Sequence, residues 1–329
     1  MRDAKIIGTG IYVPEKILTN ADLSLNLGED IDEFVTSVVG IKERHIAADD
    51  ESTADLATFA AENALADAGM LAGDLDLILL ATDTPEYLSP ATSVVVQDRI
   101  GAKNAGTYDI NAACAGFVTT LDAAYKYVIA DASYQNILVV GCYVMSKFVD
   151  WKDKRTSTLF ADGAGAMVIR AVKNEQHFLA SKLVADGSYH DYMGIFAGGT
   201  KTPVTREVLD ANDLNHLRFA KKYPPEVNID GWPNIVNDVL AKVNMTANDV
   251  DMFLWTQVNI STIEIVMSKM QIPENKTHTI MHKWGYTGSA CIPMVFHDAL
   301  VEGKIRRGDV VVLCASGGGL NMACLAMKY

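Results

Sequence analysis

The chain has 329 residues, of which 49% are hydrophobic and 21% are charged, and its formal net charge is −13. This composition predicts one large or two medium-sized folded domains, and the acidity argues against nucleic acid as a partner, because such binding depends on clustered Lys and Arg. The apolar runs all fall short of the ~18 residues of a membrane span. Five cysteines without a CxxC pair and seven scattered histidines favour a reduced, cytoplasmic protein with no metal site.

In chain order, residues 1–7 favour a first β-strand rather than a signal peptide. Residues 65–79 then predict a helix, a short polar turn and a buried strand. A second strand leads into Asp-Ile-Asn-Ala-Ala-Cys-Ala-Gly-Phe at residues 109–117, where a helical pattern begins and continues to Tyr127.

Cys114 therefore occupies a strand-to-helix turn. Free backbone N–H groups and the positive end of the helix dipole favour a thiolate at such a position, and a thiolate there is a candidate nucleophile for acyl transfer. The alternative is a buried structural cysteine. The small residues on both sides of Cys114 favour the nucleophile, because packing alone would fill that space with larger side chains.

The chain also repeats itself. Residues 240–254 resemble residues 65–79 at a constant spacing of 175 positions, and residues 298–313 resemble residues 122–140 at nearly the same spacing. The repeat predicts two pseudo-symmetric α/β halves, residues 1–172 and 173–329, with buried and largely parallel sheets. We expect the junctions after strands in both halves to converge on a cleft at Cys114.

Six segments, in order, resemble the thiolase superfamily, and most closely its β-ketoacyl-acyl-carrier-protein synthase III branch: residues 6–14, 40–44, 109–117, 160–166, 285–293 and 316–319. The resemblance implies a five-layered αβαβα fold and a homodimer, with a heterodimer as the alternative. It also implies an acyl-enzyme intermediate on Cys114. By the same resemblance, the N–H groups of Gly318 and Cys114 form an oxyanion hole for the thioester carbonyl.

The resemblance fails at two positions. The family normally completes its site with a His and an Asn, which stabilise the enolate that a malonyl group leaves when it loses carbon dioxide. Thr256 and Tyr286 stand at those positions. Neither is a good base near neutral pH, although both hydroxyls donate hydrogen bonds.

Other residues are candidates for the missing acid or base. His282 lies four residues before Tyr286, and His190 lies in the loop at residues 186–191. Asp83 follows the buried strand at residues 77–80.

The expected substrate-binding residues also depart from the family pattern. By resemblance, Phe34 stacks on the adenine of CoA, whereas the neighbouring basic positions hold Val38 and Ser261, so that Lys154 alone keeps a positive charge there. Loss of two guanidinium–phosphate contacts weakens CoA binding, which leaves an acyl-carrier protein as the alternative donor.

Two further residues are expected to bind substrate. Asn259 belongs to the same junction as Thr256. Ser89, before Pro90, replaces an often bulky residue that gates the acyl tunnel from the partner subunit, which suggests a more open acyl pocket.

The leading hypothesis is an acyltransferase of specialised metabolism that needs no cofactor. It loads an acyl group from CoA or a carrier protein onto Cys114 and passes it to a small-molecule acceptor without decarboxylation. One alternative is a condensing enzyme of the ketoacyl synthase III type with an atypical triad. The other is a non-catalytic partner subunit of a heteromeric synthase.

Overall fold

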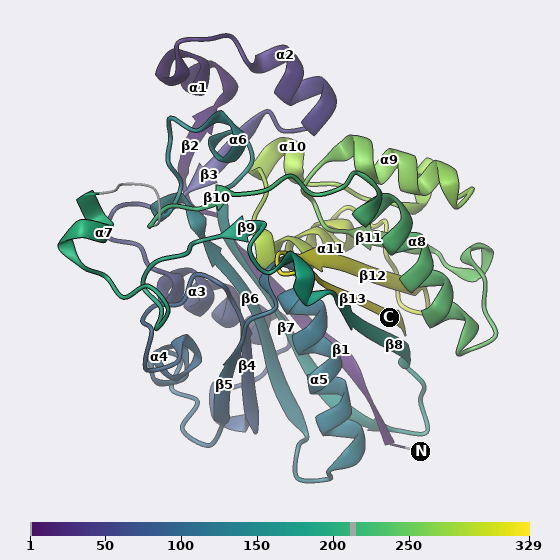
Figure 1. The fold of residues 1–329 in the computed structure, drawn as a ribbon. Helices are drawn as coiled ribbons and strands as arrows, with labels where there is room; N and C mark the ends of the chain where they lie inside the picture. Colours follow the sequence, from purple (N-terminus) through teal and green to yellow (C-terminus); the bar gives the residue numbers. More distant parts are fainter. Residues whose placement is uncertain (1, 211–214) are drawn as a thin grey trace.

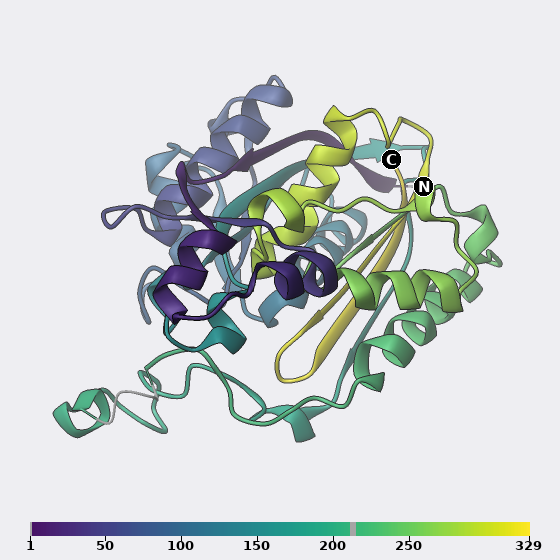
Figure 2. The ribbon, with the colours of Figure 1, turned by 90° about the horizontal axis from the view of Figure 1, so that it is seen from above.

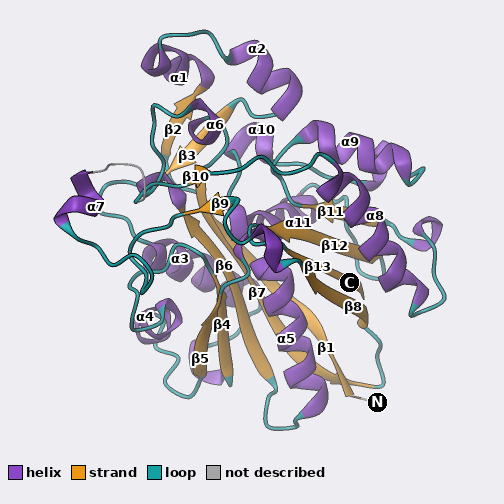
Figure 3. Cartoon of the chain, viewed as in Figure 1, coloured by secondary structure: helices purple, strands orange, loops and turns teal. Residues whose placement is uncertain are grey.

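Two β-sheets form the centre of the molecule, with helices between them and outside both (Figures 1 and 3). The structure is a computed structural model that describes residues 2–210 and 215–329. The first sheet holds, in spatial order, β1 (Arg2–Tyr12), β7 (Asp162–Lys173), β6 (Asn136–Val144), β4 (Leu77–Ala81) and β5 (Gly106–Ile110). The second holds β11 (Met252–Trp255), β12 (Val310–Gly317), β13 (Asn321–Lys328) and β8 (Phe178–Ala185).

The two sheets share one pattern of strand directions. In the first, β4 runs parallel to β5 and β6, while β7 runs antiparallel to β6 and β1. In the second, β11 is parallel to β12, and β13 is antiparallel to β12 and β8. The prediction of two pseudo-symmetric halves is confirmed at this level. In the place that corresponds to β5, the second half shows a single parallel bridge between Phe253 and Thr277.

The prediction of largely parallel sheets is wrong, because both sheets are mixed. The error has a physical cause: a strand that is buried on both faces is apolar at every position, whichever way it runs. The first eight residues of β7 are all buried, although the strand is antiparallel to both neighbours.

Helices form three layers around these sheets. The outer face of the first sheet is covered by α3 (Thr53–Asp67) and α4 (Thr92–Arg99), and the outer face of the second by α8 (Glu226–Ala241) and α9 (Ile260–Lys269). Between the sheets lie α5 (Gly116–Ala130) and α11 (Cys291–Val301). Both central helices are almost wholly buried, which fits their apolar sequences. The predicted five-layered αβαβα fold is therefore confirmed.

Short elements surround the upper end of these layers. They are α1 (Asn20–Leu27), α2 (Asp32–Phe34), α6 (Lys154–Ser157), α10 (Met281–Trp284), and the two-stranded pairs β2 (Lys16–Thr19) with β3 (Glu43–Ile46) and β9 (Met193–Gly194) with β10 (Arg218–Phe219). Figure 2 shows α7 (Arg206–Asp210) at the edge of the molecule, away from the sheets. Within the described part of the chain, every helix is too short or too polar to span a membrane.

Candidate active site

Cys114 lies where β5 ends and α5 begins, as the sequence predicts. A short 3-10 turn (Ala113–Ala115) joins the two elements, and Ala113 adopts the left-handed conformation with a φ of 47°. For a residue with a side chain this backbone is strained, and such strain is common at functional sites. No described side chain caps the start of α5 with a hydrogen bond, and Cys114 lies two residues before that positive helix end.

The surroundings of Cys114 oppose ionisation in spite of this helix end. The side chain is 3% exposed, and burial raises the pKa of the thiol well above its usual value. The negative charge of Asp83 raises it further, whereas a hydrogen bond with the Tyr286 hydroxyl lowers it. The sequence-based expectation of a resting thiolate is therefore not met: the resting group is a thiol that must lose a proton before it attacks.

Tyr286 is placed against Cys114 by a bend in the backbone. Gly285 precedes it with a φ of 72°, and a Cβ at Gly285 would lie only 2.7 Å from the Cβ of Ala161. Tyr286 is then fixed from both sides, because its N–H donates to the Leu159 carbonyl at 3.0 Å and its carbonyl accepts from the Ala161 N–H at 2.9 Å. Burial and the neighbouring Cys114 raise the pKa of the phenol well above its usual value, so the phenol is a donor rather than a base.

Thr256 is held at the end of β11 and is 1% exposed. Its Oγ1 accepts a hydrogen bond of 2.9 Å from the Ser316 N–H, which leaves its own proton available to a ligand. Thr256 and Tyr286 both line the same cavity as Cys114.

The glycine turn after β12 packs against the nucleophile. A Cβ at Gly317 would lie 2.7 Å from the Cys114 nitrogen and 2.6 Å from the Ala112 carbonyl oxygen. Only glycine allows this approach. Gly318, the next residue, lines the cavity beside Cys114.

The cavity over Cys114 has a volume of about 250 Å³ and is largely apolar. Its floor holds Cys114, Thr256, Tyr286 and the glycine turn. Its walls are Phe160, Met193, Phe219, Tyr223, Pro224, Pro225, Val227, Asn228, Val258, Thr262 and Leu320. Histidine is absent from this set of described lining residues.

Of the three alternative acid–base candidates, Asp83 alone lies close to the thiol. β4 and β5 are parallel neighbours with Ala81 opposite Ile110, so Asp83 and Cys114 both follow strands that end at the same edge of the sheet. Burial raises the pKa of Asp83 to about 6. Its Oδ1 atom is buried and has no hydrogen-bond partner among the described residues.

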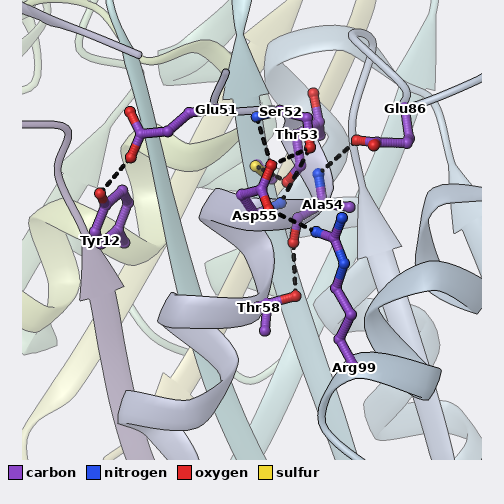
Figure 4. Close-up of polar contacts among 10 residues, drawn as sticks. Tyr12, Glu51, Ser52, Thr53, Ala54, Asp55, Thr58, Glu86 and Arg99 are labelled. Carbon is purple, nitrogen blue, oxygen red and sulfur yellow. Dashed lines mark hydrogen bonds and ion pairs between the residues drawn. The ribbon is translucent and has the colours of Figure 1, made fainter. Parts of the chain in front are cut away.

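The loop that carries Asp83 is tied to the start of α3 (Figure 4). The Glu86 carboxylate accepts a hydrogen bond of 2.9 Å from the Ala54 N–H, in the first turn of that helix. Thr53 Oγ1 also donates to the Thr84 carbonyl at 2.5 Å. Glu86 therefore stabilises a helix N-terminus, and the loop holds Asp83 at the sheet edge.

The two histidine candidates lie elsewhere. His190 is exposed and follows the turn at Gly187–Tyr189. His282 lies in α10 and lines a separate cavity with Glu264 and Lys304. Asn259 is also outside the set of residues that line the Cys114 cavity. Its Oδ1 caps α9 instead, by accepting a hydrogen bond of 3.1 Å from the Thr262 N–H.

The predicted donor entrance is partly assembled. Phe34 and Lys154 line one cavity; Phe34 is 62% exposed, and the Lys154 Nζ pairs with Glu29 at 2.8 Å. The two positions that lack their expected basic residues contact each other instead, since Ser261 Oγ donates to the Val38 carbonyl at 2.6 Å. This bond joins α9 to the segment after α2.

One group of acidic and histidine side chains outside the cavity has the composition of a metal site. His278, Asp298 and Glu302 bring their ligand atoms within 4.8 Å of one another. Lysine ammonium groups already contact all three: Lys283 contacts Asp298 at 2.7 Å, and Lys304 contacts His278 Nδ1 and the Glu302 carboxylate, each at 2.9 Å. The group is thus a partly buried ion network, and no metal is assigned to it.

Sequence reasoning missed the cavity wall formed by Met193, Phe219, Tyr223 and Asn228. Met193 and Phe219 belong to the two-residue strands β9 and β10, Tyr223 precedes α8, and Asn228 lies in the first turn of α8. The stretch between β8 and α8 has no clear helical or strand periodicity in the sequence. The run Tyr-Pro-Pro before α8 was the one available signal, since Pro is common at the first positions of a helix.

Five layers in two related halves, with a cysteine at the start of a central helix, define a thiolase-like protein. Family models agree: the 3-oxoacyl-[acyl-carrier-protein (ACP)] synthase III model matches residues 108–187, and the model of its C-terminal part matches residues 240–329. The chain belongs to the 3-oxoacyl-ACP synthase III family. Its relatives there transfer acyl groups.

Curated relatives and solved structures extend over the whole chain. The chain is 37% identical to β-ketoacyl-ACP synthase III of Caldanaerobacter subterraneus subsp. tengcongensis, over 99% of this chain and 98% of that protein. It is 39% identical to the enzyme of the same name from Geobacillus kaustophilus, over 99% of both chains. The crystal structure of 3-oxoacyl-ACP synthase III from Aquifex aeolicus superposes with a TM-score of 0.89 at 34% identity and covers 99% of this chain and 100% of that one.

Proposed function

We propose that this protein is an acyltransferase of specialised metabolism, which loads an acyl group onto Cys114 and passes it to a small-molecule acceptor without malonyl decarboxylation. The observation that carries the proposal is the set of groups around the thiol. The cavity keeps Cys114 and the glycine turn, which acyl loading needs, but it holds the hydroxyls of Thr256 and Tyr286 where decarboxylation needs an imidazole and an amide.

Loading begins with removal of the thiol proton. Asp83, with a pKa of about 6, is ionised near pH 7.5 and accepts that proton. The Cys114 sulfur attacks the donor thioester, a new C–S bond forms, the old C–S bond breaks, and the proton leaves on the departing thiol. The N–H groups of Cys114 and Gly318 stabilise the oxyanion, and Tyr286 donates a hydrogen bond to the sulfur while it is charged.

In the transfer step the acceptor is the nucleophile and the Cys114 sulfur is the leaving group. The acceptor's nitrogen or oxygen attacks the acyl carbon on Cys114, a C–N or C–O bond forms, the C–S bond breaks, and the acceptor's proton returns to the sulfur by way of Asp83. Thr256 Oγ1, which accepts a hydrogen bond from the Ser316 N–H, uses its own proton to donate a hydrogen bond to the acyl oxygen. These steps are balanced without a cofactor or metal.

A condensing activity is the second candidate function, and the names of the relatives favour it. They are β-ketoacyl-ACP synthases III at 34–39% identity. In that reaction Thr256 and Tyr286 would have to stabilise an enolate with neutral hydroxyl donors alone. A non-catalytic subunit is less well supported, because the pocket and the strained turn at Cys114 are both intact.

The donor is an acyl-CoA or an acyl-carrier protein, and we place the protein in the cytoplasm as a homodimer. An unpaired edge strand supports the dimer, since β5 ends the first sheet. Beside it Tyr87 and Leu88 are 54% and 84% exposed, and Ser89, the expected gate residue, is exposed as well. A second copy would cover these apolar side chains, whereas a heterodimer would do so with a different chain.

Acyl loading is tested by intact-mass measurement after incubation with acetyl-CoA, longer acyl-CoAs and acyl-carrier proteins. The expected result is a gain of one acyl mass in the wild type and none in Cys114→Ala. If no donor adds mass to the wild type, the catalytic proposals are wrong and the hypothesis of a partner subunit gains support.

A further inference from the structure

Two buried polar atoms, Tyr223 Oη and Asn228 Oδ1, belong to residues that line the Cys114 cavity. Asn228 Oδ1 makes no hydrogen bond to any described residue. Burial raises the pKa of the Tyr223 phenol, and its Oη lies beside the Gly319 backbone, whose N–H lowers that pKa. Tyr223 precedes α8, and Asn228 lies in its first turn. Both residues line the same cavity as Cys114.

The apolar surroundings of these two atoms make their burial unfavourable in free energy unless a ligand forms hydrogen bonds with them. The wall around them consists of Met193, Phe219, Pro224, Pro225 and Val227, which offer no hydrogen bonds from their side chains. A buried polar group in such a setting is unfavourable without a partner. A few convergent polar groups in an apolar pocket are also the usual sign of a small-molecule site.

From this we propose that Tyr223 and Asn228 form the acceptor subsite, which binds a small amine or alcohol with an apolar, ring-sized body. The inference rests on the proposed acyltransferase function and names its acceptor class. Asn228 Oδ1 can only accept, so it selects a ligand that carries N–H or O–H, the groups that act as nucleophiles in acyl transfer. Tyr223 Oη serves as a donor or an acceptor to a second polar atom.

The size of the cavity sets the size of the acceptor. Its volume is about 250 Å³, and an apolar cavity of about 150 Å³ holds a benzene molecule. Aromatic neighbours favour a flat body: Tyr223 stacks on Tyr189 with ring centres 5.6 Å apart, and Phe219 lies in the same wall.

Asn228 acts on the acceptor as a positioning residue, because its amide does not titrate and takes no proton. It accepts from one N–H or O–H and so turns the lone pair of that atom toward the acyl carbon on Cys114. Removal of its oxygen should therefore impair transfer and leave loading unchanged.

The test uses the full chain, preloaded on Cys114 with the donor that gives the mass gain, and benzylamine or benzyl alcohol as acceptor. Discharge of the acyl-enzyme is followed by intact mass. We expect saturable discharge by the wild type, and at least a tenfold lower kcat/KM in Asn228→Leu, mainly through KM. Loading rates should agree within twofold. Asn228→Asp, which keeps an accepting oxygen, should recover most of the loss.

Asn234→Leu is the matched control, because Asn234 is exposed on the same helix. Equal discharge in the wild type and Asn228→Leu would overturn the subsite while the acyltransferase function stands. Slower acyl loading in Asn228→Leu would also overturn the acceptor subsite, because Tyr223 and Asn228 would then bind the acyl donor rather than the acceptor.

If no donor loads Cys114, the proposed function fails, and ligand-observed NMR of benzylamine with the unloaded protein decides the subsite separately. The subsite is supported if the wild type and Asn234→Leu bind benzylamine and Asn228→Leu does not. The subsite is contradicted if the wild type and both variants bind benzylamine equally, or if none of them binds it.

Discussion

Cys114 and Tyr286 depend on each other at the scale of single residues. The thiol is buried beside an acidic group, and both features raise its pKa. The phenol is the neighbour that lowers it. Burial and Cys114 raise the pKa of the phenol well above its usual value, so under the proposed function it stabilises negative charge on the sulfur without taking part in proton transfer.

Tyr286→Phe should therefore slow acyl loading by about tenfold to a hundredfold, because a hydrogen bond to a charged group contributes about 1.5–3 kcal/mol. The same variant should raise the pH at which Cys114 reacts with iodoacetamide. Both rates are measured by intact mass, with Cys114→Ala to identify the modified site. Wild-type rates in Tyr286→Phe would remove the phenol from the chemistry.

Asp83 links activity to stability. Its folded pKa of about 6 lies above the ordinary value of 3.8. The ionised carboxylate is therefore less stable in the folded state than in the unfolded chain: the contribution of Asp83 to the free energy of unfolding falls as the pH rises from about 4 to about 6 and is then constant.

Asp83→Asn should remove that penalty. We expect its free energy of unfolding to match the wild type near pH 4 and to exceed it above pH 6 by about 3 kcal/mol, since the pKa rises from 3.8 to about 6 and each pKa unit is about 1.4 kcal/mol. Loading by the variant should be slower and should lose the rise with pH near 6. Urea denaturation at both pH values and the loading rate check the prediction; a variant less stable at pH 8, or equally active, would contradict it.

At the scale of elements, the site depends on how the glycine turn after β12 meets the start of α5. Gly317→Ala would force a Cβ to within 2.7 Å of the Cys114 nitrogen. We expect acyl loading to fall at least a hundredfold, because the oxyanion hole would be displaced, with a loss of stability of about 1–3 kcal/mol.

Gly187→Ala is the control for this change, because no heavy atom would lie within 4 Å of a Cβ there. Normal loading by Gly317→Ala would show that the close contact is not part of the active site.

The sequence predicted the elements that carry strong local signals. The Cys114 turn was evident from its small residues, and the two halves from their repeat. Strand direction was not predictable, because β7 is as apolar as a parallel strand. The high pKa of Cys114 depends on burial and on Asp83, and the position of Tyr223 and Asn228 at the cavity depends on where the start of α8 packs. Neither fact can be read from local pattern.

At the scale of the whole molecule, each of the two halves supplies part of the candidate active site. The first supplies Cys114 and Asp83 from the ends of neighbouring strands, and the second supplies Thr256, Tyr286 and the glycine turn. Under the proposed function, the fate of the acyl group after loading distinguishes this protein from its relatives, which are named β-ketoacyl-ACP synthases III.

The most direct test is to mix acyl-loaded enzyme with malonyl-carrier protein and to measure both the acyl mass on Cys114 and the release of carbon dioxide. We predict that the acyl group stays on Cys114 and that no carbon dioxide forms, while a small amine or alcohol discharges it. Discharge by malonyl-carrier protein with matching release of carbon dioxide would contradict the proposed function and identify a condensing enzyme.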